Sequence, residues 1–204
     1  MKTFLTKPLT LLITGALGLF VALAAWAFVS PVGSSPDDNF HQANIWCGWG
    51  TRAGLCEPVG ASSAQVPEEL LNTCFVEVTT PASCQGANFG VDMVPNHVIE
   101  ALNVNVRDYP PLFYATMSLM ASNQLVPSVI AMRLVNSALF VGVLVALTVL
   151  LGPRWRKPLL LTSLGTLVPL GLFIIPSTNP SSWAFLAGIT TWIAVAGFLS
   201  ANDE

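Results

Sequence analysis

Residues 29–41, Val-Ser-Pro-Val-Gly-Ser-Ser-Pro-Asp-Asp-Asn-Phe-His, mark the point at which a long apolar segment ends and a polar, acidic one begins. Asp37, Asp38 and His41 are the first ionisable side chains after Lys7. A pair of carboxylates beside an apolar phase is costly unless water, a partner or a cation stabilises it. The stretch therefore separates a first membrane segment from an outer domain, and it contains the best candidates for chemistry.

The composition of the whole chain indicates an integral membrane protein. Hydrophobic residues make up 53% of the 204 residues and charged residues only 9%, whereas charged residues make up about a quarter of an ordinary soluble domain. The sequence has no basic tract of the kind that binds nucleic acid, so no nucleic-acid partner is expected. It also has no Gly-rich phosphate loop, nucleophile elbow or zinc-protease signature, which leaves soluble nucleotide or hydrolase chemistry without support.

The first apolar segment, within residues 1–29, is expected to be a transmembrane helix. Its uncharged run follows Lys2 and Lys7 and, at 1.5 Å per residue, reaches roughly 30 Å, the thickness of a bilayer core. The lysines favour a cytoplasmic N-terminus. A cleaved signal peptide is the alternative, because Ala24-Ala-Trp-Ala offers small residues at a cleavage site. The apolar run is longer than a signal core, which favours the uncleaved helix.

Three further transmembrane helices are expected in residues 128–204, the second of them at residues 159–175. Before them, a second apolar stretch is broken by the paired prolines at 110–111, the polar residues 122–124 and Pro127. Residues 112–127 are therefore expected to form a helix in the outer interface, where tyrosines are favoured. The basic turn at residues 152–158 carries three positive charges and should be cytoplasmic by the positive-inside rule. The expected fold is thus an all-α, multi-pass membrane protein with four transmembrane helices and cytoplasmic N- and C-termini.

Residues 30–111 are expected to form an extracytoplasmic loop domain, and all four cysteines lie in it. Their spacings do not match a C-x₂₋₄-C zinc site, so disulfides are the better interpretation. Four cysteines allow three pairings, of which Cys47 with Cys56 and Cys74 with Cys84 are favoured because short loops close at the least entropic cost. Disulfides require the oxidising, extracytoplasmic side, and they would staple a small core.

Several short motifs carry a resemblance to a known family. They are, in chain order, Ser-Pro-Asp-Asp-x-x-His ending at His41, the cysteines around Cys74 and Cys84, Arg107-Asp-Tyr-Pro-Pro-Leu-Phe-Tyr, Ala131-Met-Arg-Leu-Val-Asn-Ser, and Asn179-Pro-Ser-Ser. With these motifs the chain resembles the N-terminal part of the bacterial membrane-protein family called domain of unknown function 2142. That family is itself similar to C-type (GT-C) glycosyltransferases. The shared order extends across nearly all of the chain.

The resemblance implies a partial GT-C-like fold in the bacterial cell membrane, whose first outer loop holds an acidic pair near a lipid-linked donor such as a polyprenyl-phosphate sugar. In such enzymes one acid acts as base toward the acceptor hydroxyl or helps to hold a divalent cation, and these roles fall on Asp37 and Asp38. The chain has Asp38-Asn39 where Glu-Pro is expected in many relatives, and relatives usually continue through several more helices. It is therefore expected to be a truncated or split member, acting beside a membrane partner that supplies further helices.

The chemistry of the acids can also be argued from the residues. A glycosyl transfer from a phospholipid needs a base near the attacking hydroxyl, and a cation or an arginine to balance the leaving phosphate. Asp37 and Asp38 are the candidate catalytic residues and the candidate ligands for Mg²⁺ or Mn²⁺, and His41 would lie on the same helical face. The alternative is that Asp37 or Asp38 simply caps a helix that begins at Asn39.

The candidate substrate-binding residues are Arg107, Tyr109, Arg133 and His41. Arg107 would lie over a phosphate headgroup, or form an interfacial ion pair with Asp108. Arg133 and Arg52 are the other arginines that could face a phosphate, although Arg133 could instead snorkel or pair with an acid of the loop.

Trp46 and Trp49 flank Cys47 and would either stack on a sugar ring or pack over a disulfide. Two functions follow from these assignments. The first is transfer of a sugar from a polyprenyl-phosphate donor to a cell-envelope glycan. The second is a non-catalytic membrane subunit, or fragment, that binds a partner or a membrane lipid.

Overall fold

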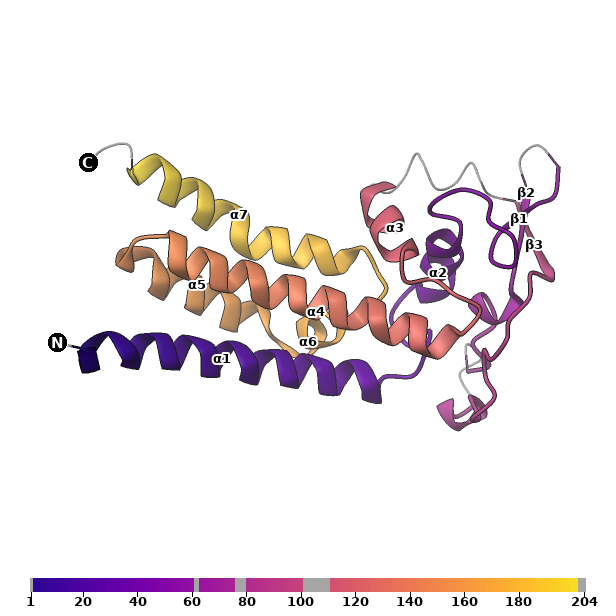
Figure 1. Ribbon diagram of the computed structural model, residues 1–204, viewed down its shortest axis with the longest axis horizontal. Coiled ribbons are helices and arrows are strands. Elements are labelled where there is room, and N and C mark those ends of the chain that lie inside the picture. Colours follow the sequence, from indigo (N-terminus) through magenta and orange to yellow (C-terminus); the bar gives the residue numbers. More distant parts are fainter. Residues whose placement is uncertain (1, 61–62, 76–79, 101–110, 202–204) are drawn as a thin grey trace. The chain divides into compact units, whose positions relative to one another are not determined.

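The structure, a computed structural model (Figure 1), describes residues 2–60, 63–75, 80–100 and 111–201. The chain divides into two units. The helical unit consists of Met1–Val29, Arg133–Ser177 and Ser181–Glu204, and the loop unit consists of Ser30–Met132 with Thr178–Pro180. The short segment Thr178–Pro180 thus belongs to the loop unit although helical-unit residues flank it on both sides in the sequence.

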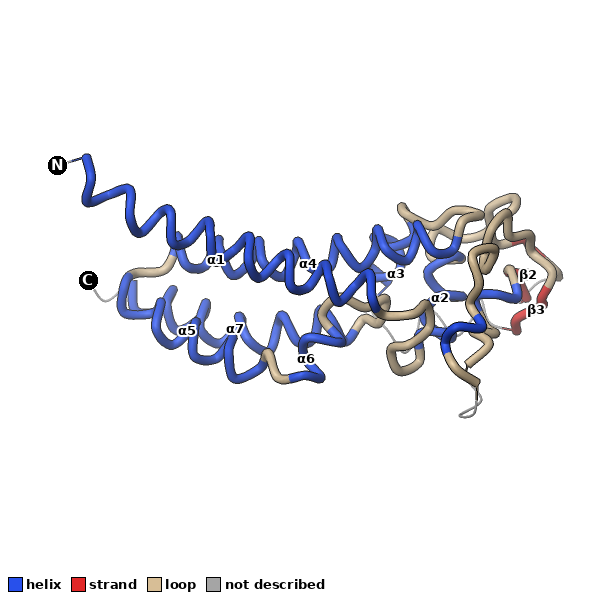
Figure 2. Tube along the Cα trace, turned by 90° about the horizontal axis from the view of Figure 1, so that it is seen from below, coloured by secondary structure: helices blue, strands red, loops and turns tan. Residues whose placement is uncertain are grey.

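Among the described residues, three helices are long and apolar enough to cross a membrane. They are α1 (Lys2–Val29), α4 (Leu125–Leu150) and α7 (Ser181–Ala201), with candidate spans at Pro8–Val29, Leu125–Leu150 and Ser181–Ser200. Figure 2 shows them as the long blue helices of the molecule. An uninterrupted helix is a stable way to cross lipid because it satisfies its own backbone hydrogen bonds. The membrane character expected from composition is therefore seen in the fold.

The fourth span expected at residues 159–175 is not confirmed as one continuous helix. The segment is divided between α5 (Pro153–Thr166) and α6 (Pro169–Ile174). Pro169 has no backbone N–H and disfavours helical geometry at the residue before it, and Val168 is accordingly extended, with a ψ of 165°. The 14 residues of α5 span roughly 21 Å, which is short of a bilayer core.

The core of the helical unit contains side chains from three helices and from the end of α6. Leu23, Phe140, Val141, Ile175 and Ile189 are buried together. Apolar side chains also cover the outside of the unit, and only 11% of the most apolar window of α1 is buried. A helix that is apolar all round is typical of a membrane span, since lipid covers the outward face.

The loop unit is a mixed structure, so the all-α prediction is wrong for this part. It contains α2 (Asp38–Trp46), α3 (Pro111–Ser118), the 3₁₀ turns η1 (Glu68–Leu70) and η2 (Ala82–Cys84), and the start of α4. It also contains a small antiparallel sheet in the order β1-β2-β3, formed by β1 (Glu57–Pro58), β2 (Ser63–Val66) and β3 (His97–Glu100). The two cysteine pairs are joined as favoured, Cys47 to Cys56 and Cys74 to Cys84.

The helix expected in residues 112–127 is shorter than predicted. It ends at Ser118, and α4 begins at Leu125 rather than at residue 128. The Ser128 hydroxyl donates to the Gln124 carbonyl oxygen at 2.7 Å and accepts from the Ser122 backbone N–H at 3.1 Å. Serine hydroxyls that compete for backbone groups favour turns over continued helix, which explains the break between α3 and α4.

Gly90 provides a test of the packing in the loop unit. It has a φ of +67°, a Cβ added to it would collide with Leu125, and its carbonyl accepts from the Leu125 N–H at 2.8 Å. We expect Gly90→Ala to lower the free energy of unfolding by about 1–2 kcal/mol from backbone strain and by about 1–3 kcal/mol more from the collision. Gly54→Ala, at φ +74° with no atom near its added Cβ, should show only the strain. Thermal unfolding in detergent measures both, and equal losses would contradict the packing.

Candidate functional site

The two adjacent carboxylates lie in different environments. Asp37 is exposed, in the left-handed conformation with φ 58° and ψ 16°, and its side chain makes no capping hydrogen bond to α2. Asp38 is the first residue of α2 and only 1% exposed, and its Oδ2 accepts from the Ser35 backbone N–H at 3.2 Å. Aspartate tolerates the left-handed region better than most residues. The helix begins one residue earlier than Asn39, and Asp37 occupies its N-cap position without a side-chain capping hydrogen bond.

Residues from far along the chain hold the segment around Asp38. The Thr178 hydroxyl donates to Asp38 Oδ1 at 2.8 Å, and the Asn179 side-chain amide donates to the Pro36 carbonyl oxygen at 2.7 Å. Both threonine and aspartate are buried. Hydrogen bonds to a charged acceptor are stronger than neutral ones, and a buried carboxylate needs them. The Asn-Pro-Ser-Ser motif thus meets the Asp-Asp motif through its first residue and the threonine before it.

His41 is buried one turn after Asp38 and contacts α3. Its Nδ1 lies 3.0 Å from the Tyr114 hydroxyl oxygen. Burial lowers the pKa of His41 from 6.5 to about 4, and the charge of Asp37 opposes this shift only in part. The imidazole is therefore neutral at neutral pH. Tyr114 ends the motif that begins at Arg107, so a third family motif reaches the same segment.

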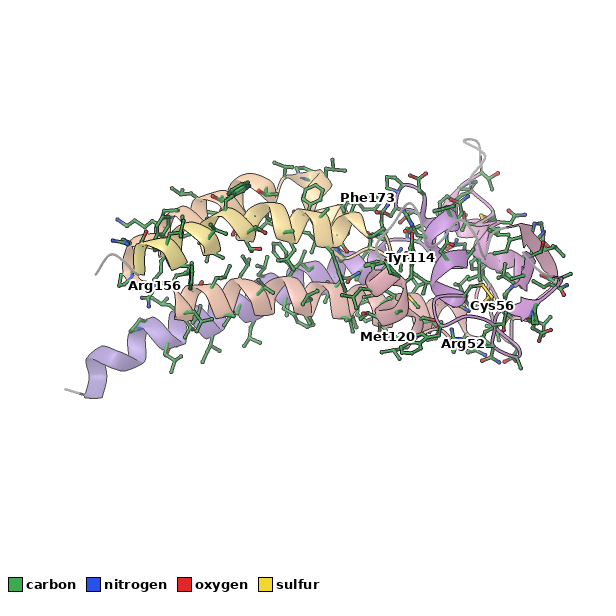
Figure 3. All side chains as sticks on the ribbon, turned by 90° about the horizontal axis from the view of Figure 1, so that it is seen from above. Arg52, Cys56, Tyr114, Met120, Arg156 and Phe173 are labelled. Atoms are coloured by element: carbon green, nitrogen blue, oxygen red, sulfur yellow. A yellow bond between two sulfur atoms is a disulfide. The ribbon has the colours of Figure 1, made fainter. Side chains whose placement is uncertain are left out.

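Arg52 and the two tryptophans join the Cys47–Cys56 loop to α3. The Arg52 guanidinium donates to the Trp46 carbonyl oxygen at 2.9 Å and to the Ser118 hydroxyl at 2.8 Å, and burial lowers its pKa. Figure 3 labels Arg52, Cys56 and Tyr114 in this part of the loop unit. Arg52, a candidate for binding a phosphate, thus donates these hydrogen bonds within the loop unit.

The tryptophans that flank Cys47 also differ in exposure. Trp46 is fully buried, and its indole donates to the Ser122 carbonyl oxygen at 3.0 Å. Trp49 is 60% exposed, and its indole donates to the Ala115 carbonyl oxygen on α3. Packing is therefore the role of Trp46, and Trp49 is the member of the pair with a ring surface open to a ligand.

The other predicted residues are placed as follows. Arg133 is buried in the helical unit, where its Nη1 donates to the Ala27 carbonyl oxygen at the end of α1 at 3.1 Å. It does not snorkel to an interface. Arg107 and Tyr109 lie outside the described residues. Across the part of the chain that the structure describes, no three His, Cys, Asp or Glu side chains gather as a metal site, so the binding of a cation by Asp37 and Asp38 stays a prediction.

Thr178, Asn179 and Tyr114 were not singled out as site residues by sequence reasoning. Their signal was membership in, or adjacency to, the motifs that carry the family resemblance, and spacing alone could not bring them together. Gln42 was missed as well. It is fully buried on α2, and its amide has no hydrogen-bond partner among the described residues. Buried amides are usually satisfied, so this is a place where a bound polar molecule would be stabilised.

Comparison with known proteins gives the family. The sequence model of the family described as "Predicted membrane protein (DUF2142)" matches residues 20–204. The chain belongs to this family. No curated protein and no solved structure matches it. The resemblance to DUF2142 is thereby confirmed, and the likeness of that family to GT-C glycosyltransferases stays a prediction.

Thr178 tests how far the buried carboxylate of this DUF2142 protein depends on its distant partner. Thr178→Val keeps the side-chain shape but removes the donor to Asp38 Oδ1, and we expect a loss of about 1–3 kcal/mol in the free energy of unfolding. Thr178→Ser keeps the hydroxyl and should lose clearly less. The measurement is thermal unfolding of the detergent-solubilised protein. If valine and serine were equivalent, the hydrogen bond would not be a source of stability.

The lowered pKa of His41 predicts a pH dependence of stability. The unfolded chain takes up a proton near pH 6.5 and the folded chain only near pH 4, so the contribution of neutral His41 is complete above pH 6.5 and is lost as the pH falls toward 4. The loss is at most about 3 kcal/mol. Glutamine does not titrate, so in His41→Gln the curve of unfolding temperature against pH should be flatter between pH 6.5 and pH 4 than in the wild type. A variant curve parallel to the wild-type curve would contradict the assignment.

Proposed function

We propose that this DUF2142 protein is a glycosyltransferase-like protein of the bacterial cell membrane that transfers a sugar from a polyprenyl-phosphate donor to a cell-envelope glycan. In this proposal it is a multi-pass protein with both termini in the cytoplasm, and the loop unit is extracytoplasmic. The two disulfides support that side, since disulfides persist in oxidising compartments.

The observation that carries the proposal is the state of Asp37. Its carboxylate is exposed, while its backbone is fixed between two anchored neighbours: the Pro36 carbonyl accepts from Asn179, and Asp38 accepts from Thr178 and Ser35. A left-handed non-glycine residue costs free energy and persists only where its surroundings determine it, and such residues cluster at functional sites. Asp37 is thus a preorganised and accessible carboxylate.

In the proposed reaction, Asp37 acts as the general base. The acceptor hydroxyl oxygen attacks the anomeric carbon of the donor sugar while Asp37 takes the hydroxyl proton. The bond from the anomeric carbon to the phosphate oxygen breaks, and the polyprenyl phosphate leaves with the electron pair. Asp38 does not touch the substrate in this scheme but positions Asp37, and the exposed ring of Trp49 is available to stack on a sugar.

The predicted divalent cation has weak support from the residues. Asp38 uses both carboxylate oxygens for protein donors, and the described residues supply no group of three ligands. Asp37 alone would have to hold Mg²⁺ or Mn²⁺ together with the substrate, and we route no step through a cation. An arginine would then have to balance the negative charge of the leaving phosphate, and we propose Arg107 for this role. Tyr109, in the same motif, is proposed as a second substrate-binding residue.

The engaged state of Asp38 and His41 favours a second candidate function. Both side chains satisfy partners inside the protein, as residues of a structural scaffold do. A non-catalytic subunit that binds a lipid or a membrane partner with further helices would need this scaffold but not the carboxylate of Asp37. The two functions therefore differ in what the removal of Asp37 should do.

The test is binding of a short-chain polyprenyl-phosphate sugar to the protein in nanodiscs, with and without Mg²⁺ or Mn²⁺, followed by sugar release in the presence of an acceptor glycan. We expect saturable donor binding by the wild type, and at least about a hundredfold slower transfer by Asp37→Asn, the scale of losing a general base. Asparagine keeps the shape and tolerates the left-handed conformation.

Asp92→Asn is the matched control, because Asp92 is also exposed and left-handed, with a φ of 51°. It should transfer sugar as the wild type does. Equal activity of Asp37→Asn and wild type would overturn the catalytic role of Asp37. Absence of donor binding by the wild type would overturn the proposal for this chain and favour the non-catalytic function.

A further inference from the structure

The helical unit contains a cavity that is lined mainly by apolar side chains and by the guanidinium of Arg156. Its volume is about 430 Å³, and its walls come from α1, α4 and α5. The apolar walls include Leu12, Ala16, Leu144 and Leu159, and Arg156 is the one charged residue among the described side chains of the lining. Nothing in the proposed transfer reaction uses this cavity, which lies entirely within the helical unit.

The cavity is open along its side. Leu11, Leu160 and Leu164 belong to its lining and are exposed by 74%, 59% and 59%. The α1 residues that line it run from Leu11 to Leu19, and those of α5 from Arg156 to Ser163 and beyond, which corresponds to roughly 12 Å of helix or more. The shape is that of an elongated apolar groove, so an extended hydrocarbon chain would bury its surface there.

The charge at the end of the groove indicates what the hydrocarbon is attached to. Arg156 is exposed, and its Nε donates to the Thr148 carbonyl oxygen at 3.1 Å. This hydrogen bond holds the guanidinium near the turn between α4 and α5. Figure 3 labels Arg156 at that end of the unit. Arg154 and Lys157 stand beside it in the sequence, and residues 146–160 contain no acid. A guanidinium held in place beside further basic residues matches a phosphate.

We propose that this groove binds one anionic phospholipid, with an acyl chain along α1, α4 and α5 and its phosphate at Arg156. The apolar wall provides affinity for any acyl chain, and Arg156 provides the preference for an anionic headgroup. The site is separate from Asp37 and does not depend on the proposed transfer. A transmembrane helix of a partner is the competing occupant of the groove.

Gly15 offers a way to fill the groove without disturbing the helix. It lines the cavity, and a Cβ added to it would meet no atom within 4 Å. Gly18 also has open space around an added Cβ, but it is not part of the lining. Gly15→Leu should therefore block the groove, and Gly18→Leu is its matched control with the same gain in helix propensity.

The experiment is titration of the full chain, delipidated in detergent, with dioleoyl phosphatidylglycerol or dioleoyl phosphatidylcholine, counting bound lipids by native mass spectrometry. We expect the wild type to retain one phosphatidylglycerol about fivefold more tightly than phosphatidylcholine, the effect of one cation on an anionic lipid. Gly15→Leu should lose both lipids, and Gly18→Leu neither.

The headgroup preference has its own pair of variants. Arg156→Gln should bind both lipids equally, whereas Arg154→Gln, which removes the same charge from a residue outside the lining, should keep the preference. The proposal is overturned if Gly15→Leu binds lipid as the wild type does, if the wild type does not distinguish the headgroups, or if a copurifying membrane protein is lost in Gly15→Leu while lipid binding is unchanged. Each of these results is independent of donor binding and of Asp37.

Discussion

The hydrogen bonds of the Asp38 carboxylate are the interaction on which the structure around the acidic motif depends. The carboxylate is buried, and it accepts from a backbone N–H three residues before it and from a threonine hydroxyl 140 residues after it. Removing a carboxylate from water is costly, and each donor offsets part of that cost only while it stays in place. The contact therefore favours the one arrangement in which Thr178–Pro180 lies against the start of α2, and it makes the alternatives less stable.

This constraint places the two neighbouring acids, Asp37 and Asp38, in different environments. Because Asp38 points inward to its donors, the chain turns at Asp37 through a left-handed conformation, and the Asp37 side chain is left in water. His41, one turn further, continues the buried side of α2 toward Tyr114. The result is one exposed carboxylate, that of Asp37, beside a buried one whose two oxygens both accept hydrogen bonds from the protein. A pair of equivalent acids sharing a cation would have required both side chains to face the same way.

The fold was predictable from the sequence where a single strong physical term decides it. The apolar runs of α1, α4 and α7 and the local pairing of the four cysteines are such cases, since length, hydropathy and loop closure point the same way.

The division of residues 159–175 was missed because apolar composition continues through Pro169, and the backbone effect of the proline outweighs it. The sheet was missed because Glu57–Pro58 and Ser63–Val66 carry little strand pattern. At the site, Asp37, Asp38 and His41 could be named, but Thr178 could not, since a single hydroxyl gives no periodic signal.

The arrangement within the helical unit bears on how the protein is oriented. Leu11 and Leu12, in the first half of α1, line the same cavity as Arg156, which follows the end of α4. The N-terminal lysines precede this half of α1 in the sequence, and Arg154, Arg156 and Lys157 follow α4 directly, so the two positive clusters belong to the same end of the unit. That is the distribution that the positive-inside rule assigns to the cytoplasmic face. The chain leaves α1 at its other end, at Val29, and the first residues it then presents are the serines, prolines and acids of the loop unit. The charge pattern and the disulfides thus both favour the orientation that we propose, from independent physical causes, namely the energetics of insertion and the redox state of the compartment.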